Sequence, residues 1–105
     1  MWAAGDDNRL MYIHMFAFRW KPDVSEAQKG LVMEGIRGLQ GQIPGLAETW
    51  VGVNVSPRGQ GYELGGVMKF ADKQSLDAYG PHPAHQKLVS WLMPLIEPLE
   101  VDFQA

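Results

Sequence analysis

The pattern of apolar positions predicts a β-strand near the amino end of the chain. Residues 12–20 (YIHMFAFRW) are dense in aromatic and aliphatic side chains, and Pro22 marks the end of this run. In a strand, successive side chains point to opposite faces, so the even-numbered and the odd-numbered positions form two separate faces. Both faces are mostly apolar, which indicates that a further layer covers each of them.

Helical spacing follows the first strand. Ser25 stands three residues before Gln28, which is the spacing of a capping box at the start of a helix. Apolar side chains then recur every three or four residues. Several glycines weaken this helix by about 1 kcal/mol each relative to Ala; either they permit close packing on the sheet, or tertiary contacts hold the helix despite them. We expect the helix to end at Pro44. The apolar stripe consists of Val32, Ile36, Leu39 and Ile43, with Met33 beside it.

Two further strands form a predicted hairpin. Residues 46–55 (LAETWVGVNV) and 62–70 (YELGGVMKF) are rich in β-branched and aromatic residues, and the loop 56–61 joins them. The pair Gly65 and Gly66 inside the second strand indicates either a β-bulge or the close approach of another group to the backbone.

Two short helices and a last strand complete the pattern. Asp72 is suited to cap a helix that runs to Tyr79. A second helix begins near Pro83, because proline is favoured at the first helical position. Prolines up to Pro98 close the helical region, and residues 99–103 then alternate between apolar and acidic side chains, as in a strand.

The resulting order of elements is β-α-β-β-α-β, with the second helical region divided in two. This order is the ferredoxin-like pattern of an α+β fold, so we expect a four-stranded antiparallel sheet with the helices on one face. The other face of the sheet is apolar too. A second copy of the chain is the simplest layer to cover it, and we therefore predict a homodimer.

Length, charge and composition narrow the functions open to this chain. Its 105 residues fit one domain at 11–105, and residues 1–10 read as a flexible lead-in rather than a signal peptide. Nine basic and twelve acidic residues give a net charge of −3 without a basic cluster, so we expect neither nucleic acid nor a membrane as a partner. The absence of cysteine excludes thiolate chemistry and suits a cytoplasmic location.

The best candidate for chemistry is the stretch 79–85 (YGPHPAH). His85 lies in the first turn of a predicted helix, where the helix amides disfavour a positive charge, and a neutral imidazole can act as a base. Tyr79 can donate a hydrogen bond to a carbonyl or enolate oxygen. A purely structural role is the alternative interpretation. In that case the prolines fix the start of the helix, and the side chains of Tyr79 and His82 form hydrogen bonds with nearby backbone groups.

An apolar pocket is expected beside this stretch. His14 lies on the aromatic face of the first strand, where it is either a buried, hydrogen-bonded histidine or a ligand contact. No spacing supports a metal site made from the three histidines, and no cofactor motif is present, so we expect neither metal nor cofactor. The expected substrate-binding residues are His14, Phe16, Phe18, Val32, Met33, Ile36, His82 and Leu88.

From Met11 onward, the sequence resembles the stress-responsive dimeric A/B barrel (Dabb) family. The resemblance implies a ferredoxin-like protomer and a homodimer whose two sheets form a dimeric α/β barrel. Six spaced segments carry it: IHMFAFRWKPDVSEAQ at 13–28, IPGL at 43–46, VGVNVS at 51–56, GGVMKFAD at 65–72, LDAYGPHPAHQ at 76–86 and VDF at 101–103.

Most proteins of this family have no assigned reaction, but its plant enzymes include a hydroxynitrile lyase and a polyketide (olivetolic acid) cyclase that performs an aldol closure. By similarity to the cyclase, Tyr79 and His85 match its catalytic tyrosine and histidine, and His14 matches its strand-one histidine. The pocket shape differs, and the same substrate is not implied. The positions that match the aromatic pocket of the cyclase are Val32, Met33 and Ile36.

These observations lead to three functional hypotheses. The first is a cofactor-independent lyase or cyclase that acts on a small, mostly apolar carbonyl compound, with His85 and Tyr79 as the catalytic residues. The second is a non-catalytic dimeric binding or stress protein. The third is a cofactor-free monooxygenase or a haem-degrading enzyme, since related dimeric barrels perform such chemistry, but the stretch 79–85 favours the first.

Overall fold

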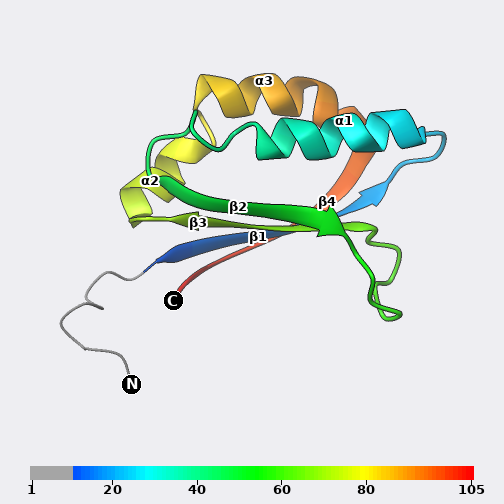
Figure 1. Cartoon of the computed structure of the whole chain (residues 1–105), viewed down its shortest axis with the longest axis horizontal. Coiled ribbons are helices and arrows are strands. Elements are labelled where there is room, and N and C mark those ends of the chain that lie inside the picture. The colour runs from blue at the N-terminus through cyan, green and yellow to red at the C-terminus, as the bar shows by residue number, and fades with distance from the viewer. Residues whose placement is uncertain (1–10) are drawn as a thin grey trace.

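The chain folds as one β-sheet with its helices packed on one face (Figure 1). The computed structural model describes residues 11–105, and the predicted lead-in lies outside the described residues. No helix within 11–105 is long and apolar enough to cross a membrane. The elements in chain order are β1 (Tyr12–Trp20), α1 (Glu26–Arg37), β2 (Leu46–Val53), β3 (Leu64–Phe70), α2 (Lys73–Tyr79), α3 (Pro83–Leu92), the 3₁₀ helix η2 (Met93–Leu95) and β4 (Ile96–Gln104).

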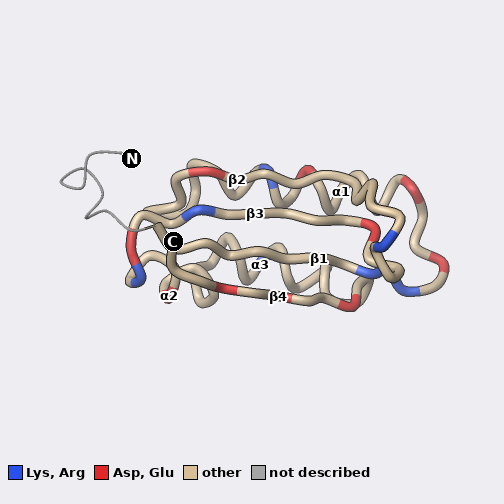
Figure 2. The backbone as a smooth tube through the Cα atoms, turned by 90° about the horizontal axis from the view of Figure 1, so that it is seen from below, with Lys and Arg blue, Asp and Glu red and all other residues tan. Residues whose placement is uncertain are grey.

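The sheet has four antiparallel strands in the order β2-β3-β1-β4. Figure 2 shows them side by side from the face that carries no helices. The central strand β1 pairs with β3 on one side and with β4 on the other. The ferredoxin-like fold is therefore confirmed, together with the division of the second helical region into α2 and α3.

Helix α1 begins where the sequence predicts but ends earlier. The Ser25 hydroxyl accepts a hydrogen bond from the Gln28 amide, and the Gln28 side chain accepts one from the Ser25 amide, which is the predicted capping box. The prediction that the helix continues to Pro44 is wrong, because α1 ends at Arg37. Gly41 has a φ of 89°, a left-handed conformation that glycine adopts without strain and that a right-handed helix cannot contain.

The hairpin strands are each two residues shorter than predicted. β2 ends at Val53, and β3 begins at Leu64. Between them Asn54 organises the loop: its side-chain amide donates to the Tyr62 carbonyl at 2.7 Å, and its side-chain oxygen accepts from the Ser56 amide at 2.9 Å. These local hydrogen bonds compete with strand pairing, so the ladder stops earlier than the propensities of the flanking residues indicate.

Gly66 allows an aromatic ring to approach the sheet closely. A Cβ atom at this position would come within 2.0 Å of the Phe16 ring, so the glycine makes room for that ring. The irregularity in the β2–β3 pairing lies instead between Leu46 and Glu48. Of the two interpretations of the glycine pair, close approach therefore applies.

The last strand starts earlier than predicted. β4 begins at Ile96, directly after η2, and includes Pro98, which the sequence placed at the end of the helical region. β4 is an edge strand, so one of its sides needs no ladder hydrogen bonds, and a proline is tolerated there.

The core fills the space between the helices and the sheet. It includes the residues of the predicted apolar stripe even where α1 has ended, since Leu39 and Ile43 are buried in the turns that follow it. The buried apolar side chains are Phe16, Phe18, Val32, Ile36, Leu39, Ile43, Leu46, Leu64, Met68, Phe70, Tyr79, Leu88, Leu92 and Ile96.

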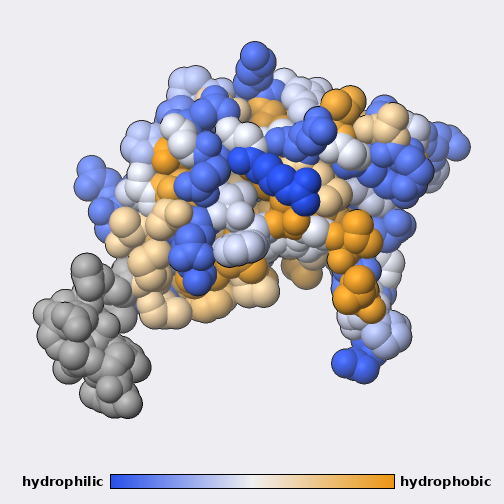
Figure 3. Space-filling model, viewed as in Figure 1, coloured by the Kyte–Doolittle hydropathy of each residue, from blue (hydrophilic) through white to orange (hydrophobic). Residues whose placement is uncertain are grey.

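The opposite face of the sheet, which we call the open face, is apolar and uncovered in the single chain. Its centre is the row Val67, Met15 and Val101, which lie opposite one another on β3, β1 and β4. On β3 and β1 the charged residues lie near the strand ends (Figure 2). Figure 3 shows apolar residues along the lower rim of the molecule, beneath the sheet. Leu99 and Phe103 extend the open face, and both are more than 40% exposed.

Candidate functional site

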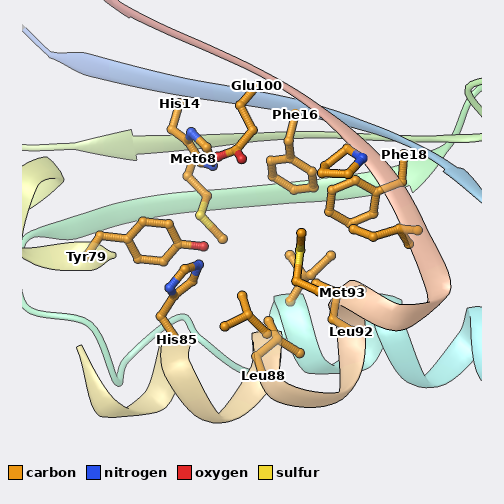
Figure 4. Close-up of a pocket in the computed structure, with 14 residues that line it drawn as sticks. His14, Phe16, Phe18, Met68, Tyr79, His85, Leu88, Leu92, Met93 and Glu100 are labelled. Carbon is orange, nitrogen blue, oxygen red and sulfur yellow. Dashed lines mark ion pairs between the residues drawn. The ribbon is translucent and has the colours of Figure 1, made fainter. Parts of the chain in front are cut away.

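A cavity of about 50 Å³ lies between the sheet and α3, and we call it the inner cavity. Most of its lining is apolar, whereas the polar side chains of His14, Tyr79, His85 and Glu100 gather at one end of it (Figure 4). The remaining lining residues are Phe16, Phe18, Ile36, Met68, Leu88, Val89, Leu92, Met93, Ile96 and Pro98.

A wider hollow of about 470 Å³ borders the same polar residues, and we call it the vestibule. His14, Tyr79, His85 and Glu100 line both spaces, so they stand between an apolar chamber and a more open, polar entrance. Such an arrangement suits a ligand with an apolar body and a polar group at one end. The vestibule is completed by Tyr12, Lys73, Leu76, Asp77, Gly80, Asp102, Phe103 and Gln104.

The imidazole of His85 is held in one tautomer. Its Nδ1 lies 2.9 Å from the carbonyl oxygen of Gly80. Since a carbonyl oxygen only accepts hydrogen bonds, we assign the ring proton to Nδ1, which leaves the lone pair of the neutral ring on Nε2. Pro83, at the start of α3, places His85 in the first turn of that helix, as predicted. The arrangement provides a candidate base at the polar end of the inner cavity.

Tyr79, the last residue of α2, is buried beside this imidazole. Its ring centroid lies 4.2 Å from that of His85 and 5.6 Å from that of His14, and its hydroxyl points into the cavity (Figure 4). Burial raises the pKa of Tyr79 far above its ordinary value, and the carboxylates of Glu100 and Asp102 raise it further. The phenol therefore stays protonated and can donate a hydrogen bond to a ligand oxygen.

This raised pKa predicts a loss of stability in alkali that Tyr79→Phe should reduce. The unfolded chain releases the phenol proton above pH 10, whereas the folded chain retains it, so the free energy of unfolding falls as the pH rises beyond 10. One proton contributes at most about 1.4 kcal/mol per pH unit. The free energy of unfolding, measured by urea denaturation between pH 9 and 11.5, should decline less steeply with pH for the variant than for wild type. Lys29 and Lys73 also have raised pKa values, but their contribution is common to both proteins and cancels in the difference. Identical slopes would contradict the prediction.

His14 on β1 is buried and paired with a carboxylate. Its Nδ1 lies 2.6 Å from Asp102 Oδ1, and its Nε2 lies 3.8 Å from Glu100 Oε1. A carboxylate accepts the proton of Nδ1, so Asp102 orients the ring and leaves Nε2 as the free nitrogen of the neutral form. His14 is thus the buried, hydrogen-bonded histidine that the sequence offered as one reading, and it also lines the inner cavity.

His82 has a structural role at the start of α3. Its Nδ1 accepts a hydrogen bond from the Ala84 amide at 3.0 Å, so the ring caps the helix. His82 lines neither the inner cavity nor the vestibule, although the sequence placed it among the substrate-binding residues.

Within residues 11–105, no three His, Cys, Asp or Glu side chains are grouped in a way that could hold a metal ion.

Two other predicted substrate-binding residues lie outside both spaces. Val32 is fully buried in the core. Met33 borders a separate hollow, together with Trp20 and Val53, at the start of α1. Helix α1 contributes only Ile36 to the inner cavity. The other predicted residues that line it are His14, Phe16, Phe18, Tyr79, His85 and Leu88.

The acidic residues of the site, Glu100 and Asp102, were not predicted from the sequence. Pairing places Asp102 opposite His14 and Glu100 opposite Phe16, so both carboxylates lie on the helix-covered face of the sheet. Val101, which lies between them, faces the open side. The alternation of acidic and apolar residues along β4 is visible in the sequence. Which face of the sheet carries the acidic residues is set by the register of β4 with β1. The apolar lining residues that were not predicted from the sequence are Met68, Val89, Leu92, Met93, Ile96 and Pro98.

The sheet order and the helices on one face define a ferredoxin-like α+β protein with a polar-ended cavity beneath α3. The profile of the stress responsive A/B barrel domain (Dabb) matches residues 13–105. The chain therefore belongs to the Dabb family. Among curated proteins, no match was found.

Solved structures share the fold. A dimeric ferredoxin-like protein of unknown function from Thermobifida fusca YX is similar with a TM-score of 0.81 and 23% identity, over 91% of this chain and 92% of that one. A second dimeric ferredoxin-like protein of unknown function, from Jannaschia sp. CCS1, has a TM-score of 0.78 and 27% identity, over 90% of this chain and 99% of that one. The hydroxynitrile lyase of Passiflora edulis has a TM-score of 0.83 and 16% identity, over 90% of this chain and 93% of that one.

Proposed function

We propose that this chain is a cofactor-independent lyase or cyclase that acts on a small, mostly apolar carbonyl compound. The observation that carries the proposal is the hydrogen bond from His85 Nδ1 to the Gly80 oxygen, at 2.9 Å, which leaves Nε2 as a base beside the Tyr79 phenol. The base and the hydrogen-bond donor border one apolar cavity. This combination suits proton transfer next to a carbonyl group.

In the direction of bond formation, His85 Nε2 takes a proton from the carbon next to the carbonyl. The electron pair of the broken C–H bond moves toward the carbonyl oxygen, and the Tyr79 hydroxyl donates a hydrogen bond to the resulting enolate. The enolate carbon attacks a second carbonyl, which forms a C–C bond and an alkoxide. The His85 imidazolium then returns its proton to that alkoxide.

In the direction of bond cleavage, His85 takes the proton of a hydroxyl group. A carbonyl forms as the adjacent C–C bond breaks, and the electron pair leaves with a cyanide or an enolate, which the imidazolium protonates. The fold that the chain shares with the hydroxynitrile lyase of Passiflora edulis supports this direction at the level of fold. The similarity of stretch 79–85 to the plant polyketide cyclase supports the same two residues in the other direction.

The apolar side chains deep in the inner cavity would hold the body of the substrate. Phe16, Phe18 and Leu88 offer contact to a hydrocarbon group, while the carbonyl lies at the polar end between His85 and Tyr79. His14 Nε2 is placed to make a further polar contact. The inner cavity is small, so a ligand larger than a few heavy atoms extends into the vestibule.

We also propose that the protein is a homodimer formed through the open face. Met15, Val101 and Phe103 are each between 40% and 50% exposed in the single chain, and the similar proteins from Thermobifida fusca and Jannaschia are dimeric. Contact of the open faces of two copies would remove this apolar surface from water. The cytoplasmic location expected from the cysteine-free sequence stays a prediction.

A non-catalytic ligand-binding role is the second candidate. The mostly apolar lining of the inner cavity supports it, because pockets for small ligands are lined mainly by apolar side chains with a few polar groups. Under this hypothesis, an apolar ligand shifts the resonances of the Tyr79 and His85 rings in NMR spectra. The protein neither exchanges the C–H hydrogens of the ligand nor makes or breaks its C–C bonds.

Deuterium exchange into a simple ketone tests the proposed chemistry without knowledge of the natural substrate. Acetophenone in D₂O has one exchangeable position, its methyl group. We expect the protein to accelerate the loss of the methyl signal in proton NMR beyond an equal concentration of free imidazole, because the cavity adds orientation and the Tyr79 hydrogen bond to the base. A rate no greater than that of free imidazole would contradict the catalytic proposal, and binding without exchange would favour the second candidate.

A further inference from the structure

The vestibule carries an excess of negative charge next to the proposed reaction centre. Glu100 and Asp102 border it from β4, and their side chains are 62% and 51% exposed. Lys73 also borders it, but its Nζ lies 2.9 Å from Asp77 Oδ2, so these two charges offset each other. Two carboxylates therefore remain that no lysine or arginine among the described lining residues offsets.

The inner cavity offers no compensating cation within the part of the chain that the structure describes. Its lining there contains one charged carboxylate, Glu100, and no lysine or arginine. Glu100 lines both the cavity and the vestibule, so it stands at the passage between them. A ligand group that projects from the reaction centre toward the solvent therefore passes close to this carboxylate (Figure 4).

We propose that Glu100 and Asp102 select the substrate by charge, so that the site accepts an uncharged aldehyde or ketone and disfavours a compound that carries a carboxylate next to its reacting carbonyl. The proposal rests on the proposed function, since it assumes that the carbonyl lies between His85 and Tyr79. With the apolar body in the inner cavity, the group on the other side of the carbonyl enters the vestibule. A carboxylate there would meet two like charges.

The expected selectivity is moderate because both carboxylates are partly exposed to water. Like charges several ångströms apart in a solvated cleft weaken binding by about tenfold, and salt reduces this difference. Glu100 is the sharper test of the two, because Asp102 also orients His14 through a hydrogen bond at 2.6 Å. A substitution of Asp102 would change both the charge and the position of an imidazole.

Two compounds of similar size separate charge from shape. Phenylglyoxylate and 1-phenyl-1,2-propanedione share the phenyl group and the adjacent carbonyl, and they differ in whether a carboxylate or an acetyl group follows. We expect the dissociation constant of phenylglyoxylate, measured by isothermal titration calorimetry at low salt, to be about tenfold higher than that of the diketone. The difference should shrink at 0.5 M NaCl, where screening is strong.

Glu100→Gln should bring the two compounds closer together. We expect phenylglyoxylate to bind this variant about threefold more tightly than wild type, with the diketone unchanged. The matched control is Glu97→Gln, which makes the same change of charge on the same strand. Glu97 pairs with Arg19, whose side chain lies on the open face of the sheet, so this control should leave both constants unchanged.

The outcomes distinguish this inference from the proposed function. Equal binding of the two compounds by wild type, or tighter binding of phenylglyoxylate, would overturn the charge selection while leaving a carbonyl-binding site in place. An equal effect of Glu97→Gln and Glu100→Gln would also overturn it, because the cause would then be net charge rather than the carboxylate at the passage. Failure of both compounds to bind would overturn the proposed function and the inference together.

Discussion

Replacing His85 by Gln should lower the rate of acetophenone exchange by a factor of about 10² to 10⁴, the usual contribution of a general base. Glutamine has a similar size but no group that takes up a proton near neutral pH. The affinity for the diketone should change little, because the apolar lining of the inner cavity is untouched. The exchange rate by NMR and the dissociation constant by calorimetry measure the two quantities separately.

The matched control for this variant is His82→Asn. His82 caps α3 through its Nδ1, and asparagine is among the best capping residues, so the helix start should be preserved. We expect exchange within about twofold of wild type, because His82 lines neither the inner cavity nor the vestibule. Unchanged exchange in His85→Gln would show that another group is the base. Thermal unfolding of both variants separates a lost base from a lost fold.

Val101→Asp should convert the proposed homodimer into a monomer. Val101 lies opposite Met15 in the middle of the open face. In a symmetric dimer, the substitution would place a carboxylate without a partner in an apolar interface on both copies. Burial of an unpaired charge costs several kcal/mol, so we expect association to weaken by at least about 10³-fold. Sedimentation at micromolar concentration should give a mass near 11.7 kDa for the variant and twice that for wild type.

Leu31→Asp is the control for this experiment. Leu31 is an exposed apolar residue on α1, and the helices lie on the other side of the sheet from the open face. The same change from an apolar to an acidic side chain should therefore leave the dimer intact. A wild-type protein that sediments as a monomer would contradict the proposed homodimer, and dissociation by both variants would show that the interface includes α1.

The elements of the fold were largely predictable from local patterns, and the errors have local causes. The nine-residue strand β1, with side chains alternating between its two faces, and the capping box at Ser25 occur where the sequence predicts them. The end of α1 was misplaced because the apolar spacing continues through Leu39 and Ile43, which are buried in turns instead of a helix. Burial sets the spacing of apolar residues, and a turn can satisfy the same requirement.

The candidate site was predictable only in part. Tyr79 and His85 are six positions apart, and the proline-containing turn between them keeps their rings close, with 4.2 Å between the ring centroids. The pairing of His14 with Asp102 joins residues 88 positions apart. The volume of the inner cavity and the exclusion of Met33 from it likewise depend on how α1 and α3 lie on the sheet.

The sequence by itself determined the order and type of the elements, the apolar character of both sheet faces, and the proximity of Tyr79 to His85. Each of these depends on the period of side chains along a strand or helix, or on backbone restrictions within a few residues. Only the tertiary structure decided which face of β4 carries its acidic residues. The register between β1 and β4 places Glu100 and Asp102 beside His14, because strand pairing follows the packing of the whole sheet against its helices.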